Sequence, residues 1–242
     1  MRRARVPISR FPVGAVGLGM SGCIYASVNL EFRGLPLSHS IHAEQFLVVN
    51  AAAVGKSKLC AIAISHMPCG HCRQFLQEIR GAGGIRIIVT SSDAKWRTVS
   101  SLLPRPFGPH DLLPKHVPLV LKPHDSPLVG NPATAVITNG FANGDLEARL
   151  REAAEAAARA AHTPYSECPS RFAVADGEGP MQAAIIGMVA AGGAAAAEDV
   201  VAAALVEKEA ALVSQEAMAR IFLAAVAPQA SFHVYNFGLS DA

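Results

Sequence analysis

The chain has 242 residues, enough for one large domain or two small ones with a substantial core. Hydrophobic residues make up 51% of the sequence and charged residues 17%, so we expect a globular and rather apolar protein. A net charge of +2 gives no strong attraction to nucleic acid or to membranes, which argues against both as partners.

The cysteines argue for a reducing compartment. There are five, an odd number, and only Cys69 and Cys72 are closely spaced, which favours a metal site over a disulfide framework. The apolar run at residues 183–197 is too short and too weak to span a bilayer. Arginines near the N-terminus hint at a transit peptide, but Pro7 and Pro12 interrupt any amphipathic helix there. We therefore expect a soluble protein of the cytosol.

The first hundred residues alternate between strand and helix patterns. In chain order, the predicted elements are strands at 13–18 and 24–32, a helix at 43–54, a strand at 59–65, a helix at 72–79 and a strand at 85–90. This alternation predicts a three-layer α/β/α arrangement. Gly14, Gly17 and Gly19 are spaced G-x-x-G-x-G and no helix follows, so they belong to a strand and its turn rather than to a nucleotide loop.

A proline-rich connector follows. Eight prolines lie between residues 104 and 132, a density that no ordinary helix or central strand tolerates. We expect an extended linker that is held to the surface by the apolar side chains of Leu102, Leu103, Phe107, Leu112 and Leu113. The predicted organisation is a first domain at 1–100, a linker at 101–143 and a second domain at 144–242.

The second domain opens with a predicted helix and then repeats the first. The helix, capped by Asp145, has an alanine-rich body that runs to residue 162. After it, the sequence around Ser166 resembles that around Ser9, each serine standing two positions after a proline. Helix, strand, helix and strand patterns then recur at 181–193, 200–206, 214–224 and 231–235.

The second copy differs from the first where chemistry is expected. Gln182 stands in the place of Glu44, and no cysteine pair follows it, so this copy cannot bind the same metal. The interval from Ser166 to Gln182 is also shorter than that from Ser9 to Glu44, by about one strand and its turn. We therefore expect a degenerate and shortened second domain.

His42, Cys69 and Cys72 have the residue types and spacing of a zinc site. Three such ligands satisfy zinc while leaving its fourth tetrahedral position open for water. The cysteines lie on one face of a predicted helix start and His42 lies at another, so two positive helix ends favour the thiolates. The alternative is a structural zinc knuckle, which normally needs a fourth ligand, and the nearest spare, His71, points away from the cysteine pair.

Glu44 is better suited to general acid/base chemistry than to metal ligation. At the first turn of its helix it can approach the same water as the metal, take a proton and deliver it to a substrate nitrogen. The alternative is a carboxylate that only favours the helix dipole, worth under about 1 kcal/mol. The whole pattern, H-x-E…P-C-x-x-C, is that of the zinc deaminases that attack C4 of cytosine or C6 of adenine.

Other polar and aromatic residues are candidates for supporting roles. Arg73 can hydrogen-bond a thiolate sulfur or form a surface salt bridge. Asn29 and Glu31 alternate on one predicted strand, where an amide beside a carboxylate suits sugar hydroxyls; a solvent-facing polar edge is the alternative. Phe11 can lie flat on a base, or it can be an ordinary aromatic core residue.

On these residues, the chain resembles the cytidine deaminases, in particular the two-domain dimeric type of plants and some bacteria. The matching stretches are Phe11-Pro-Val-Gly-Ala15, Asn29-Leu-Glu-Phe32, His42-Ala-Glu-Gln45, Pro68-Cys-Gly-His-Cys-Arg-Gln-Phe75 and Phe107-Gly-Pro-His-Asp-Leu112. A histidine rather than a cysteine at position 42 goes with the dimeric type. That type normally also has a helix before Pro7 and a fuller second domain between Gly179 and Pro180.

The resemblance implies a cytidine-deaminase-like α/β/α fold, with a catalytic domain followed by a degenerate copy. It implies one Zn²⁺ per chain, bound by His42, Cys69 and Cys72, and a proton shuttle at Glu44. It further implies that the residues at 29 and 31 hold the ribose 3′-hydroxyl and that the aromatic ring at 11 packs beside the pyrimidine.

The function so implied is zinc-dependent hydrolytic deamination of cytidine and deoxycytidine to the uridines with release of ammonia, in pyrimidine salvage. The expected partners are a nucleoside and a second copy of the chain. A polynucleotide cytosine deaminase is one alternative, but it would need a basic groove and aromatic platforms, and the chain has one Trp and three Tyr. A catalytically impaired partner subunit is the other, and the complete set of metal and shuttle residues argues against it.

Overall fold

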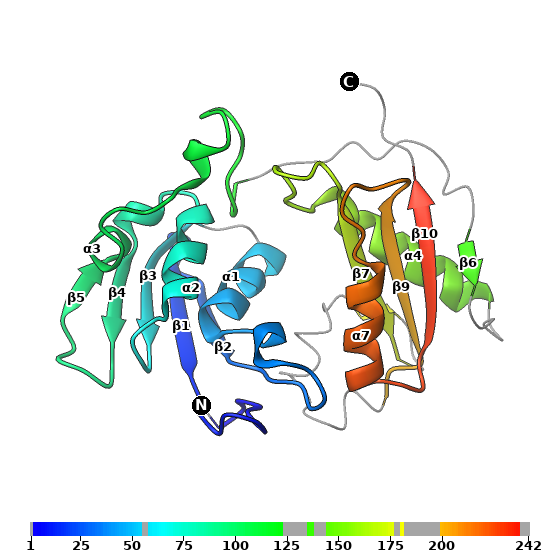
Figure 1. The fold of residues 1–242 in the computed structure, drawn as a ribbon, viewed down its shortest axis with the longest axis horizontal. Coiled ribbons are helices and arrows are strands. Elements are labelled where there is room, and N and C mark those ends of the chain that lie inside the picture. Colours follow the sequence, from blue (N-terminus) through cyan, green and yellow to red (C-terminus); the bar gives the residue numbers. More distant parts are fainter. Residues whose placement is uncertain are drawn as a thin grey trace. The chain divides into compact units, whose positions relative to one another are not determined.

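The computed structural model describes residues 2–54, 58–122, 135–137, 144–176, 180–181 and 199–237. They belong to two compact units, Met1–Pro123 and His124–Ala242, which we describe one at a time (Figure 1). A search of the described residues finds no helix that is both long and apolar enough to cross a membrane.

The first unit contains a five-stranded sheet in the order β2-β1-β3-β4-β5. Its strands are β1 (Gly14–Gly19), β2 (Ile24–Val28), β3 (Leu59–Ile64), β4 (Arg86–Val89) and β5 (Trp96–Thr98). β1 runs antiparallel to β2 and β3, β3 is parallel to β4, and β5 is antiparallel to β4. The strands predicted for this unit are confirmed, although β2 ends earlier than expected, and β5 is a strand that the sequence pattern does not predict.

The helices of the first unit carry the candidate metal ligands at their N-terminal ends. They are α1 (Ala43–Val54), α2 (Gly70–Phe75) and α3 (Val99–Leu102), with short 3-10 turns at Leu37–His39, Leu76–Glu78, Ala82–Gly84 and Pro109–Asp111. α1 has the predicted bounds. α2 begins earlier than predicted because Cys69 is its N-cap, with Sγ accepting a hydrogen bond from the backbone N–H of Cys72.

One face of this sheet forms the core. Along β1, Ala15 and Gly17 are buried, whereas Val16 and Leu18 on the opposite face are 44% and 40% exposed. A Cβ at Gly17 would lie 3.1 Å from a methyl carbon of Leu47 in α1, so glycine lets helix and strand pack closely. The glycine-rich run is therefore part of a packed strand, as predicted, and not a nucleotide loop.

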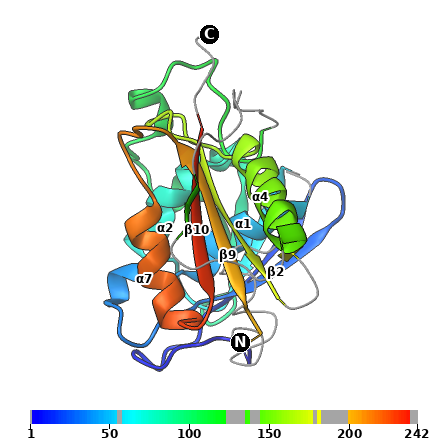
Figure 2. The ribbon, with the colours of Figure 1, turned by 90° about the vertical axis from the view of Figure 1, so that its right-hand side faces the viewer.

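The second unit contains a sheet in the order β6-β10-β9-β7-β8. Its elements are β6 (Ala135–Ile137), α4 (Gly144–Arg159), β7 (Ser170–Ala175), β8 (Pro180–Met181), β9 (Ala202–Lys208), α7 (Glu216–Val226) and β10 (Ser231–Phe237). Figure 2 shows α4 and α7 on opposite sides of the strands, and each helix packs on its own cluster of buried side chains. The unit is thus a three-layer α/β/α structure, as predicted.

The two sheets repeat one another. β8-β7-β9-β10 has the order and strand directions of β2-β1-β3-β4. The fifth strand of each sheet comes from a different part of the chain. β5, beside β4, follows it in the sequence, whereas β6, beside β10, comes before the other strands described in its unit. In the second unit β8, two residues long, takes the position of β2. Of the helix predicted at 181–193, the structure describes only Met181, which belongs to strand β8 instead; the rest of that range, including Gln182, lies outside the described residues.

The same turn opens both copies. The amide two residues after Ser9 donates to Ser9 Oγ at 3.1 Å, and the corresponding amide after Ser166 donates to Ser166 Oγ at 3.4 Å. Arg10 and Glu167, which follow the serines, both have positive φ, 58° and 51°, and each donates its amide to the carbonyl four residues earlier at 3.0 Å. In each copy, the hydrogen bond that the serine Oγ accepts stabilises the uncommon positive φ of the next residue. These matching hydrogen bonds confirm the repeat.

The described part of the linker, residues 101–122, differs from the expectation in its anchors. Leu102 packs on the core of the first unit as predicted. Phe107 and Leu112 are 60% and 63% exposed, so their predicted role as anchors is wrong. Leu119 and Leu121 are buried instead, because the chain returns to the first unit only after the Pro109–Asp111 turn.

Candidate functional site

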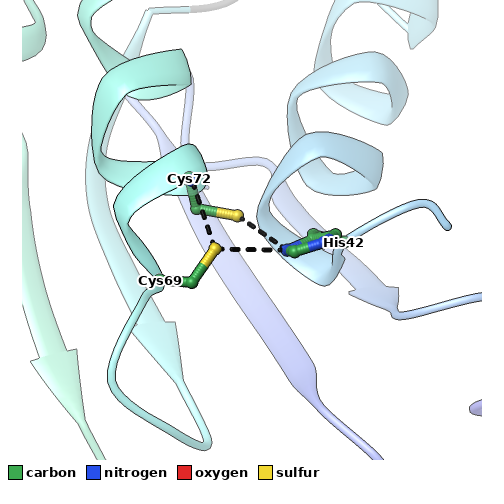
Figure 3. Close-up of side chains that lie close together, drawn as sticks. All are labelled: His42, Cys69 and Cys72. Carbon is green, nitrogen blue, oxygen red and sulfur yellow. Dashed lines mark hydrogen bonds between the residues drawn. The ribbon is translucent and has the colours of Figure 1, made fainter. Parts of the chain in front are cut away.

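His42, Cys69 and Cys72 converge where α1 and α2 begin (Figure 3). Their ligand atoms lie within 4.8 Å of one another, with His42 Nδ1 3.4 Å from Cys69 Sγ and 3.3 Å from Cys72 Sγ. Zinc binds sulfur at about 2.3 Å and nitrogen at about 2.0 Å, so two ligands of a tetrahedral zinc lie about 3.5 Å apart. The cluster therefore fits zinc without rearrangement of the backbone.

The strands hold His42 in place from two sides. Ile41, directly before it, exchanges two backbone hydrogen bonds of 2.9 Å with the fully buried Leu30. On the other side, Ser27 Oγ on β2 donates to the carbonyl of Ala43 at 2.7 Å. The imidazole is thus attached to an end of α1 that is fixed to the sheet.

Burial and nearby negative groups set the electrostatics of the cluster. Glu44 is only 3% exposed and forms a side-chain hydrogen bond with Cys72. Burial raises the pKa of the Cys72 thiol far above its ordinary value, and the charges of Glu44 and Cys69 raise it further. A cation at this point relieves both effects, because metal coordination deprotonates a thiol.

The fourth ligand that a structural zinc site needs is not part of this cluster. Among the described residues, the group that could hold a metal contains only the three predicted ligands. The spare candidate, His71, has its Nε2 atom 2.9 Å from Gln45 Nε2, and its ring centroid lies 5.8 Å from that of His42. Three ligands with one open position is the arrangement typical of catalytic zinc.

Glu31 is buried and ionised beside the N-terminal segment. It is 4% exposed, and its Oε2 accepts hydrogen bonds from the amides of Ile8 at 2.8 Å and Ser9 at 3.0 Å, while Oε1 accepts one from the Ser9 hydroxyl. Burial acts to raise the pKa of Glu31, but these hydrogen bonds together lower it below its usual value. The alternative of a solvent-facing polar edge is therefore wrong for Glu31.

Asn29 also binds the N-terminal segment, and among the described contacts one of its side-chain N–H groups stays available beside Glu31. Its Oδ1 accepts from the amide of Val13 at 2.8 Å, and its Nδ2 donates to the carbonyl of Phe11 at 2.9 Å. A carboxylate accepts about four hydrogen bonds and an amide NH₂ donates two. Within the described structure, these contacts leave an acceptor position on Glu31 Oε1 and one N–H of Asn29, a combination that suits a hydroxyl group.

Phe11 is at the surface, so its alternative as a core residue is wrong. Its ring is 52% exposed and lies 4.6 Å, centroid to centroid, from the ring of His66, at an interplanar angle of 54°. His66 belongs to the loop between β3 and Cys69, which brings Phe11 close to the metal-binding loop.

Arg73 acts on the backbone next to the cluster. Its Nε donates to the carbonyl of Pro68 at 2.8 Å and its Nη1 to the carbonyl of Leu102 at 3.4 Å. In the described part of the chain these contacts differ from both predicted ones, a thiolate hydrogen bond and a surface salt bridge. The guanidinium thus holds the loop that leads into Cys69.

Sequence reasoning missed the partners of the predicted site residues. Ser9 binds Glu31, His66 packs on Phe11, and the Gln45 side chain contacts His71. Of these partners, only Gln45 could have been predicted from the sequence. It stands three positions after His42, the residue before α1, and a glutamine at that position is half of a capping box. The others contact residues far away in the sequence.

The chain is similar in sequence to proteins of one family. Residues 1–88 and 99–179 each match a family model described as the cytidine and deoxycytidylate deaminase zinc-binding region. Cytidine deaminase 1 of Arabidopsis thaliana is 44% identical over 96% of this chain and 86% of its own length, and Cytidine deaminase 6 is 39% identical over 98% and 88%. The crystal structure of cytidine deaminase from Mycobacterium tuberculosis is 33% identical, with a TM-score of 0.39, over 43% of this chain and 85% of its own.

Proposed function

The chain belongs to the cytidine deaminase family, and from this we propose that its first unit deaminates cytidine and deoxycytidine to the uridines and ammonia. The carrying observation is the convergence of His42, Cys69 and Cys72 around an open coordination position beside the buried Glu44. The reaction is a hydrolysis, in which water replaces the exocyclic amine at C4 of the base.

The three ligand atoms would hold one Zn²⁺ per chain. When bound, zinc supplies a Lewis acid that makes water nucleophilic near neutral pH. The N-terminal ends of α1 and α2 favour the negative charge of the sulfurs, and Cys69 Sγ accepts the amide N–H of Cys72 at 3.5 Å. These contacts stabilise negative charge on the sulfur atoms of the exposed Cys69 and the buried Cys72.

Glu44 moves the protons. Its carboxylate takes a proton from the attacking water and gives it to the ring nitrogen; the second proton of that water follows to the leaving amine, which departs as ammonia. Burial supports this role, because a carboxylate that is shielded from bulk water interacts more strongly with the charges that develop on the base.

Glu31, Asn29 and Phe11 hold the nucleoside. The ionised Glu31 accepts a hydrogen bond from a sugar hydroxyl, and the remaining N–H of Asn29 donates to the same oxygen. The exposed ring of Phe11 lies beside the pyrimidine. What supports this assignment is the shared attachment of Asn29 and Glu31 to residues 8–13, the segment that carries Phe11.

We further propose that the enzyme works as a homodimer in pyrimidine salvage in the cytosol. The described cysteines are all free, which accords with a reducing compartment. Histidine at position 42 goes with the dimeric type of the family. Measuring the mass in solution, with cytidine turnover in the same fractions, tests the dimer: activity in a monomeric fraction would contradict it.

Glu44→Ala tests the proposed function. The variant should keep one zinc per chain but lose cytidine turnover by about 10²–10⁴-fold, the usual contribution of a positioned acid/base group. The matched control is Glu216→Ala, which removes a first-turn carboxylate of α7 in the second unit and should leave turnover unchanged.

Zinc content by atomic spectroscopy and loss of cytidine absorbance over time are the measurements. Retained turnover in Glu44→Ala would rule out the shuttle. A zinc-loaded, folded wild-type protein without turnover would instead identify a pseudoenzyme. Turnover of a single-stranded oligonucleotide but not of cytidine would identify a polynucleotide deaminase.

A further inference from the structure

One carboxamide lies between the two helices that supply the metal ligands. Gln45, in the first turn of α1, accepts a hydrogen bond at Oε1 from the backbone N–H of His42 at 2.9 Å. Its Nε2 lies 2.9 Å from Nε2 of His71, which stands between Cys69 and Cys72 on α2. A single side chain thus contacts the backbone of one ligand residue and the neighbour of the other two.

The direction of these hydrogen bonds follows from the backbone. The His42 N–H can only donate, so it fixes the carbonyl oxygen of Gln45 on its side. The NH₂ group then faces His71 and donates to its Nε2, which is the acceptor of this pair. Both ends of the carboxamide therefore have a complementary partner.

We propose that Gln45 and His71 form a bridge that sets the distance between the His42 and cysteine ligands and so determines how tightly zinc is held. They are positioning residues, not ligands, and this inference rests on the proposed zinc site. The ligands come from the starts of two helices that are separate in the sequence. Along the chain, α1 follows β2 and precedes β3, and α2 follows β3 and precedes β4. A contact that spans the helices at the level of the ligands fixes their relative position where the metal needs it.

The expected size of the effect follows from exposure. Groups that orient metal ligands typically change metal affinity by about 10–100-fold when removed. Gln45 is half-buried and His71 is exposed, so water competes for this bond. We therefore expect the lower end of the range, about tenfold.

A competing explanation is that Gln45 serves only as part of the cap of α1. Cap and bridge make different predictions for His71, because the cap needs only the hydrogen bond from Gln45 to His42. Gln45→Ala removes both functions, whereas His71→Ala removes the bridge and leaves the cap. His71→Gln keeps a side-chain acceptor at that position and should restore most of the affinity.

The experiment is a competition for zinc between the loaded protein and a chelator of known affinity. The wild type, Gln45→Ala, His71→Ala, His71→Gln and the double alanine variant are compared, with circular dichroism to verify folding. Each single alanine variant should bind zinc about tenfold more weakly. The double variant should be no weaker than the singles, because the same bridge is already broken.

Gln77→Ala is the matched control. Gln77 Nε2 donates to the carbonyl of Arg73 at 3.2 Å, a contact between neighbouring turns of one segment, so its loss should leave zinc affinity unchanged. Wild-type affinity in His71→Ala would overturn the bridge, whether or not Gln45→Ala is weakened. A wild type that holds zinc without deaminating cytidine would contradict the proposed function alone, because the zinc affinities still measure the bridge. A wild type that holds no zinc would overturn both.

Discussion

The two units have sheets of the same topology but use the start of the equivalent helix differently. In the first unit, Cys69 caps α2, and its sulfur and that of Cys72 point to His42. In the second, the buried Glu207 on β9 accepts hydrogen bonds from Ser214 Oγ at 2.9 Å and from the amide before α7 at 2.8 Å. Both units place a hydrogen-bond acceptor, a sulfur in the first and a carboxylate in the second, at the N-terminal end of a helix, and in the first unit this acceptor is part of the candidate metal site.

The opening turns of the two units differ in the same way. Ser9 and Ser166 accept equivalent backbone hydrogen bonds, but of the two, within the described residues, Ser9 alone also donates to a buried carboxylate, that of Glu31. The residue two positions after each serine is the exposed Phe11 in the first copy and the buried Cys168 in the second. The repeated backbone is therefore a scaffold, and a few side chains distinguish the proposed binding segment of the first unit from the corresponding segment of the second.

The largest expected effect tests whether the chemistry is confined to the first unit. Cys69→Ala should lose zinc and reduce cytidine turnover by more than about 100-fold. Loss of a residue that only hydrogen-bonds a metal ligand costs up to about 100-fold, and loss of a ligand itself should cost more. Cys168→Ala, which removes the buried cysteine of the second unit, should keep one zinc per chain and full turnover. Zinc content and cytidine absorbance are measured on both; a Cys69→Ala variant that still holds zinc would contradict the assigned ligand set.

A smaller effect is expected at the two serines. Ser9→Ala removes a hydrogen bond to Glu31 and should raise KM for cytidine about tenfold with little change in kcat, equivalent to about 1.4 kcal/mol. Among the described contacts, Ser166→Ala breaks the equivalent backbone hydrogen bond alone, and it should leave KM unchanged. Steady-state kinetics on both variants makes the comparison.

The contact between Ser9 and Glu31 also has a signature in the pH dependence of stability. The pKa of Glu31 is lower in the folded state, so its contribution to stability is present above the ordinary pKa of a glutamate and is lost as the pH falls through the folded value. Because Ser9→Ala brings the two pKa values closer, the variant should lose less stability than the wild type on acidification. A steeper loss in the variant than in the wild type would contradict this account.

The smallest effect on zinc binding and turnover is expected for a change in the second unit, which should alter stability alone. Glu207→Ala leaves Ser214 and the amide of Gln215 without their acceptor and should lower the free energy of unfolding by about 1–3 kcal/mol. Zinc content and turnover should stay at wild-type values. Urea unfolding measures the first, and a loss of zinc in this variant would show that the two helix ends are not independent.

Local pattern alone determined much of the fold and the identity of the candidate site. Short apolar runs bounded by turn residues predict β1, β3, β4, β9 and β10, and a helical run that stops at Gly55 predicts the bounds of α1, because propensity and burial act over a few neighbouring residues. The spacing of His42, Glu44, Cys69 and Cys72 predicts a metal and a shuttle, since residue type and helix geometry are local properties. The repeat was also readable, from the order of its elements.

Only the tertiary structure decided which side chains support that site. Gln45 and His71 lie 26 positions apart and Ser9 and Glu31 lie 22 apart, so no periodicity relates them. The exposure of Phe107 and the origin of the outer strand, β5 in one unit and β6 in the other, likewise depend on long-range packing. Sequence spacing specifies the ligands of this centre, whereas the contacts that hold them arise only when distant segments pack together.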